Sequence, residues 1–136
     1  MMHASDIAAY RPLCLELPGG EILNRYTDEQ AAAICNGVGA VWFDRIAPRA
    51  SAVLNRRNPW AVPASIIHDL CYHEGEGGDA GRALADCRFL AGCRQCIEWC
   101  SSYRLTLWWR NRKADALYCT LRQFGKLAWE GKGKND

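Results

Sequence analysis

The fold of this chain is decided by the stretch PASIIHDLCYH, which covers residues 63–73. A proline opens the stretch and Gly75 lies just past its end, so we predict one helix over these residues. On that helix His68 and Tyr72 share a face, while Asp69 points about 100° away. The histidine and the aspartate therefore cannot act on the same group. They can act on two adjacent groups, one that needs a base and one that needs an anion.

A second predicted helix carries a carboxylate on its apolar stripe. It follows a loop over Gly75–Gly81, and its apolar positions recur every three or four residues. The stripe consists of Asp86, Phe89, Leu90, Cys93, Cys96, Ile97 and Cys100. Burying a carboxylate alone is costly, so Asp86 needs a partner. If the two helices run antiparallel, Asp86 faces His68, with Tyr72 placed to bond the same carboxylate. A histidine taken alone is more often a core residue.

The rest of the chain favours further helices. We expect residues 1–26 to be irregular, because prolines and glycines interrupt them. The capping box Thr27-Asp-Glu-Gln30 predicts a short helix that stops at Gly37, followed by a tight loop over Asn36–Gly39. Residues 44–63 form a connection rich in proline and arginine.

A last helix is predicted after a break at Ser101-Ser102. One face of it would carry Ala114, Leu117, Tyr118, Leu121, Phe124 and Ala128. We expect a helical domain over residues 27–129 and a disordered tail over residues 130–136. No segment alternates steadily between apolar and polar residues, so the predicted fold class is all-α.

Length, composition and net charge exclude several classes of protein. A length of 136 residues suits one domain, and 49% hydrophobic with 24% charged residues excludes a disordered or fibrous chain. The net charge of +2 does not indicate nucleic-acid binding. The longest uncharged run, Gln30–Phe43, is too short for a transmembrane segment. Without a recognisable signal peptide, the expected location is cytoplasmic, virion-associated, or outside the cell by a non-classical route.

Charge, cysteine and tryptophan each leave alternatives open. Residues 45–57 and 104–126 are basic, which fits binding of anionic lipid or nucleic acid, or simply solvated faces and loop charges. The spacing of Cys93, Cys96 and Cys100 fits a zinc site, an apolar core, or disulfides to Cys87 or Cys119. Among the tryptophans, Trp42 and Trp129 suit core packing, whereas Trp60, Trp108 and Trp109 suit either a lipid interface or the core.

These motifs resemble the phospholipase A2 superfamily. The similarity lies in CNGVG at residues 35–39, HDLCY at residues 68–72 and DCRF at residues 86–89. More closely, NGVGAVWF at residues 36–43 and LYCTLRQFGKLAW at residues 117–129 resemble small phospholipase A2-like proteins of bacteria and phages.

The resemblance implies a calcium-dependent hydrolase that cleaves an acyl ester of a glycerophospholipid, with a phospholipid surface as its substrate and a role in lipid degradation. By that analogy His68 is the base that acts on water, Asp86 orients it, and Tyr72 steadies Asp86. Calcium would take carboxylate oxygens from Asp69 and backbone carbonyls from Cys35, Gly37 and Gly39, all of them hard donors. The bound metal would stabilise the oxyanion.

The chain departs from the secreted members at three positions. Those members have Tyr in place of Cys35, Gly in place of Ala40 and Cys in place of Ala85, so their disulfide plan is not reproduced. These departures favour an alternative: a catalytically inactive relative that binds a protein partner or forms part of a phage particle.

Overall fold

The computed structural model describes residues 2–35 and 50–130. All regular structure within these ranges is helical, which confirms the all-α class. The loop expected over Asn36–Gly39 lies outside the described residues, as does most of the expected tail. Within the described helices, none is both long and apolar enough to cross a bilayer.

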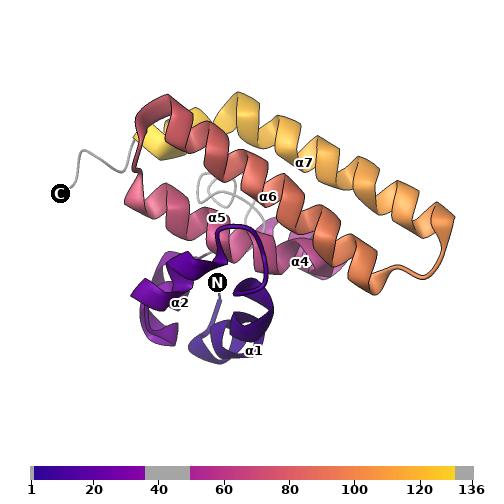
Figure 1. Cartoon of the computed structure of the whole chain (residues 1–136), viewed down its shortest axis with the longest axis horizontal. Coiled ribbons are helices and arrows are strands. Elements are labelled where there is room, and N and C mark those ends of the chain that lie inside the picture. Colours follow the sequence, from indigo (N-terminus) through magenta and orange to yellow (C-terminus); the bar gives the residue numbers. More distant parts are fainter. Residues whose placement is uncertain (1, 36–49, 131–136) are drawn as a thin grey trace.

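Three long helices form an antiparallel layer with α6 in the middle (Figure 1). They are α5 (Val62–Glu74), α6 (Gly78–Cys100) and α7 (Arg104–Glu130). Gly75 caps α5 in the left-handed conformation, with φ of 62°, as its position predicted. Gly92 of α6 lies against Ala64 of α5, where an added Cβ would stand 3.0 Å from the alanine methyl. This close approach sets the distance between the two helices that carry the predicted site.

The prediction that residues 1–26 are irregular is wrong, because they form α1 (Ala4–Cys14) and the 3-10 helix η1 (Gly20–Arg25). Pro12 lies in the last turn of α1, where it removes one helical N–H donor, so α1 forms against the local preference of the sequence. Tertiary contacts stabilise the segment. The Arg11 guanidinium donates to the carbonyls of Leu23 at 2.9 Å and Tyr26 at 2.8 Å, and pairs with Asp28 at 2.8 Å.

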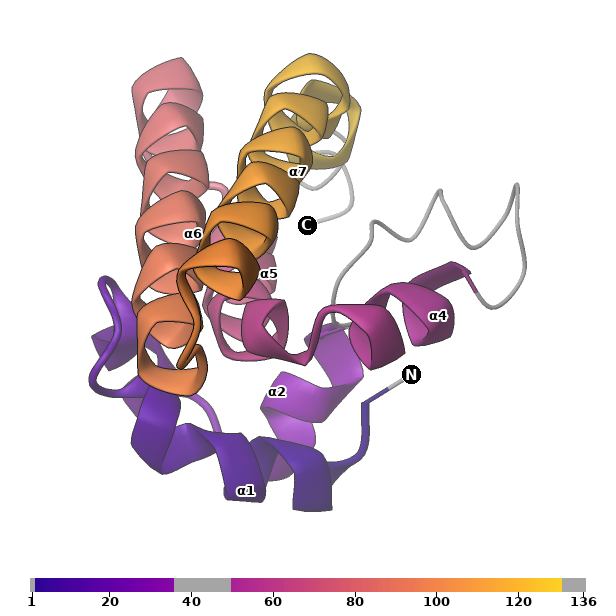
Figure 2. The same cartoon turned by 90° about the vertical axis from the view of Figure 1, so that its right-hand side faces the viewer.

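The capping box predicts α2 (Asp28–Ile34) correctly. The Gln30 backbone N–H donates to the Thr27 hydroxyl at 3.2 Å, and the Thr27 backbone N–H donates to the Gln30 side chain at 2.9 Å. The two residues thus satisfy donors that a helix start otherwise leaves without partners. Figure 2 shows α2 and α1 together on one side of α5.

The connection expected over residues 44–63 contains the helices α4 (Ala50–Arg57) and η2 (Pro59–Ala61). The proline of η2 opens that short helix instead of preventing it, since a first-turn position needs no N–H. Trp60 is only 5% exposed and joins the core, so core packing is the one of its two open alternatives that the structure supports.

Two further predictions need correction at the ends of α6 and α7. The loop before α6 is shorter than Gly75–Gly81, because the helix begins at Gly78. On α7, Phe124 is exposed and Gly125 is buried against the Tyr72 hydroxyl instead. Near a large tyrosine, only a residue without a side chain allows α7 to approach.

The cysteines on the α6 stripe behave as small apolar residues. Cys93 and Cys96 are buried, together with Cys14 of α1, while Cys100 is exposed. No disulfide joins the cysteines of the described residues. Nor does any group of three or more His, Cys, Asp or Glu side chains in that part of the chain suit a metal ion. Of the three alternatives, apolar core fits Cys93 and Cys96.

Candidate active site

Helices α5 and α6 bring the predicted histidine and aspartate into direct contact. Nε2 of His68 lies 2.8 Å from Oδ1 of Asp86, and the carboxylate is fully buried. The two residues are eighteen positions apart, on antiparallel helices that meet near their shared turn. The predicted pairing is confirmed.

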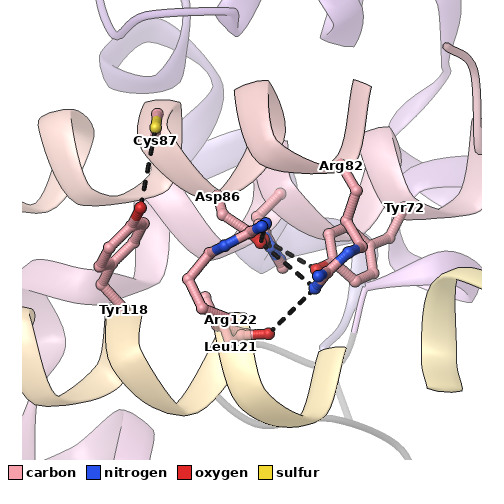
Figure 3. A network of polar contacts seen from close by, with 8 residues as sticks. Tyr72, Arg82, Asp86, Cys87, Tyr118, Leu121 and Arg122 are labelled. Atoms are coloured by element: carbon pink, nitrogen blue, oxygen red, sulfur yellow. Dashed lines mark hydrogen bonds and ion pairs between the residues drawn. The ribbon is translucent and has the colours of Figure 1, made fainter. Parts of the chain in front are cut away.

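The Asp86 carboxylate receives donors at both of its oxygens. Oδ1 also accepts a hydrogen bond from the Tyr72 hydroxyl at 2.8 Å, as the one-turn spacing of Tyr72 from His68 predicted. Oδ2 accepts from the Arg122 guanidinium at 2.7 Å, and Arg82 lies 3.6 Å away (Figure 3). A buried carboxylate held in this way is fixed in position and orientation.

These contacts keep Asp86 ionised. Burial raises the pKa of the carboxyl, but the hydrogen bonds from the surrounding side chains outweigh it, so the pKa lies below its ordinary value. An ionised carboxylate only accepts hydrogen bonds, so Nε2 of His68 carries the proton in this pair. The lone pair of the neutral imidazole is then on Nδ1, which is the nitrogen that can accept a proton.

Sequence reasoning did not find the two arginines of the site. Arg82 precedes Asp86 by one helical turn on α6, a spacing that places charged pairs side by side. This spacing is visible in the sequence and could have identified Arg82. Its guanidinium also donates to the Leu121 carbonyl of α7 at 3.4 Å, while its Nε is buried and has no hydrogen-bond partner among the described residues. Arg122 lies 36 positions from Asp86 and gave no local signal.

Aromatic side chains enclose the pair. The ring of His68 lies 4.1 Å from that of Tyr72 and 5.4 Å from that of Phe89, measured between centroids. Trp129 of α7 contacts Tyr72 edge-on at 5.1 Å. Burial and the bond to the carboxylate raise the pKa of the Tyr72 hydroxyl, so it stays protonated and donates. Little solvent therefore reaches the carboxylate side of the histidine.

The predicted calcium ligands are only partly described. Asp69 is half-buried on α5, directly after His68. Cys35 ends α2, and its thiol donates to the Ile66 carbonyl of α5 at 3.5 Å. Cys35 therefore lies beside α5, next to a residue three positions before Asp69. Gly37 and Gly39 lie outside the described residues.

Comparisons with protein-family models, with curated proteins and with solved structures found no match to this chain. What the site does is therefore inferred from its own geometry and from the motifs that form it.

Proposed function

We propose that this protein is a phospholipase A2-like hydrolase that releases a fatty acid from a glycerophospholipid in the presence of calcium. The contact that supports the proposal is the one between Nε2 of His68 and Oδ1 of Asp86, at 2.8 Å with both side chains buried. It provides a base oriented by a carboxylate, the arrangement that activates a water molecule without a nucleophilic side chain.

In the proposed mechanism, water attacks the ester carbonyl carbon while Nδ1 of His68 takes a proton from it. Asp86 stays ionised and stabilises the imidazolium through the hydrogen bond from Nε2. The bond from the carbonyl carbon to the alcohol oxygen then breaks, and the imidazolium returns its proton to that oxygen. The products are a fatty acid and a lysophospholipid. Proton transfer of this kind accelerates a reaction by roughly 10²–10⁴-fold.

The residues proposed to hold calcium suit that ion. Asp69 would supply carboxylate oxygens, and Cys35, Gly37 and Gly39 would supply backbone carbonyls; a hard cation prefers such oxygens. The start of this loop at Cys35, next to Ile66 of α5, is consistent with ligands from both segments. When bound, calcium would polarise the ester carbonyl and stabilise the oxyanion.

The test is release of fatty acid from phospholipid vesicles, with and without a chelator. We expect His68→Gln to lose at least about 100-fold in rate, since the base is removed. His73→Gln is the matched control, because His73 is exposed further along the same helix. Equal rates for folded His68→Gln and the parent protein would show that the mechanism is wrong.

A second candidate function is binding without catalysis, to a protein partner or within a phage particle. The observation that favours it is the pair of guanidiniums near Oδ2 of Asp86, at 2.7 and 3.6 Å. Their positive charge offsets the negative charge that would stabilise an imidazolium. Calorimetry separates the two candidates: calcium affinity that Asp69→Asn abolishes supports the hydrolase, and a chain that neither binds calcium nor releases fatty acid supports binding alone.

A further inference from the structure

The end of α6, the turn after it and the start of α7 expose large apolar side chains. Five of them, between 50% and 77% exposed, lie within eleven residues of the chain. They are Trp99, Tyr103, Leu105, Trp108 and Trp109. Isolated exposed apolar residues are ordinary, but a cluster with three tryptophans at one end of a molecule marks a contact surface.

These side chains do not belong to the core face of α7. Leu105, Trp108 and Trp109 have the three- and four-residue spacing of one helix face. The buried Ala114 lies on the opposite face of the same helix, toward α6. The first half of α7 thus has two apolar faces, one used for folding and one turned to solvent.

Cations accompany the exposed face. Residues 99–114 contain Arg104, Arg110, Arg112 and Lys113 and no acidic residue, in a chain whose total net charge is only +2. The Arg112 guanidinium lies 5.6 Å from the centroid of Trp108, and the Lys113 ammonium lies 5.8 Å from that of Trp109. The cations therefore lie beside the exposed rings, and the cations and rings form one continuous surface. We call the five apolar residues with these four cations the aromatic–basic tip.

We propose that the aromatic–basic tip docks the protein on an anionic phospholipid surface. Tryptophan and tyrosine favour the boundary between headgroups and acyl chains, and neighbouring cations favour anionic lipid. A second copy of this chain is a poorer binding partner for the tip, because the cations of the two copies would face one another. The proposal is independent of hydrolysis, since docking through the tip does not use His68 or Asp86.

Docking through this tip would also set the position of the site relative to the lipid surface. Arg122 of the site lies on the same helix, thirteen residues after Trp109, which is about 20 Å along the axis. The protein would therefore contact lipid through one end of α7 while the other end contributes to the site.

The experiment is sedimentation with vesicles of phosphatidylglycerol and phosphatidylcholine in equal parts, compared with phosphatidylcholine alone. It uses His68→Gln, so that no lipid is consumed. We expect binding to the mixed vesicles only, with a blue shift in tryptophan emission. The double variant Arg112→Gln/Lys113→Gln should bind about 25-fold more weakly, at about five-fold per cation. Its matched control, Arg56→Gln/Arg57→Gln, removes two exposed cations from α4 and should bind normally.

A second pair of variants tests the apolar part. Trp108→Ala/Trp109→Ala should weaken binding by about ten-fold or more, while the control Leu15→Ala/Leu84→Ala truncates exposed apolar residues elsewhere and should not. Three results would overturn the proposal. They are equal binding to both kinds of vesicle, an equal loss in the α4 control, and self-association on concentration that Trp108→Ala/Trp109→Ala abolishes, which would assign the tip to a second copy.

Discussion

Replacing Asp86 with asparagine removes the charge that four side chains surround, without changing the volume of the residue. The introduced side chain could still accept a hydrogen bond from His68 or Tyr72 through its amide oxygen. Its amide N–H₂ would face donors, however, and the two guanidiniums would lose their counter-charge. The perturbation thus isolates the electrostatic role of this carboxylate from its packing.

The expected loss of stability follows from burial. Breaking a buried ion pair on one side costs about 3–5 kcal/mol. Arg122 is 34% exposed and can turn its charge to water, whereas Arg82 is only 9% exposed. We therefore expect the low end of that range, about 3 kcal/mol, which corresponds to roughly 12 °C in Tm for a chain of this size.

Urea unfolding and thermal melting measure this loss, and the chain offers a matched control. Asp115 pairs with Arg94 at 2.8 Å, a distance close to the 2.7 Å between Asp86 and Arg122. Both partners of the control pair are about half exposed, so Asp115→Asn should cost no more than about 1 kcal/mol. The two substitutions have the same chemistry and differ in burial.

A loss for Asp86→Asn no larger than that for Asp115→Asn would refute this reasoning. The double variant Asp86→Asn/Arg122→Met provides a second check, because removing the uncompensated cation should recover part of the loss. If Arg122→Met gives the same change in both backgrounds, the two side chains are not coupled and the network is not a stabilising unit.

Three other predictions concern the helices around the site. Gly125→Ala would place a Cβ 2.5 Å from the Tyr72 hydroxyl and should destabilise the protein by about 1–3 kcal/mol; in the Tyr72→Phe background, where that oxygen is gone, chemical denaturation should show a smaller cost. The pKa of Asp86 is lowered by folding, so its contribution is complete above the ordinary value of 3.8 and is lost as the pH falls through the lower folded pKa. The difference in unfolding free energy between the parent and Asp86→Asn should therefore shrink below pH 3.8, and a constant difference would contradict the assignment. Thr27→Ala removes the cap of α2 and should cost about 1 kcal/mol by urea unfolding, with no change in any activity toward vesicles.

Local patterns predicted much of the helical framework. Helix α5 followed from an early proline and the glycine just past its end, and α2 followed from its capping box. The contact of His68 with Asp86 could be predicted because an antiparallel pair of helices joined by a short turn has few alternative arrangements. Each of these signals acts within a few residues, or across one turn.

Other features depend on contacts that no local pattern contains. Helix α1 forms despite Pro12, since Arg11 and the buried Ile7 tie it to the rest of the chain. Which residue of α7 meets Tyr72 depends on the angle at which α7 crosses α6, and periodicity alone wrongly selected Phe124 over Gly125.

The sequence by itself determined the all-α class, the helices of the site and the pairing of His68 with Asp86, because periodicity and capping act at short range. Only the tertiary structure decided that Arg122 is a partner of the second carboxylate oxygen. Arg122 reaches it across 36 positions, and a long side chain finds such a partner only once two helices have packed. For the same reason the tryptophans divided between core and surface only after folding, with Trp60 inside and Trp108 and Trp109 exposed.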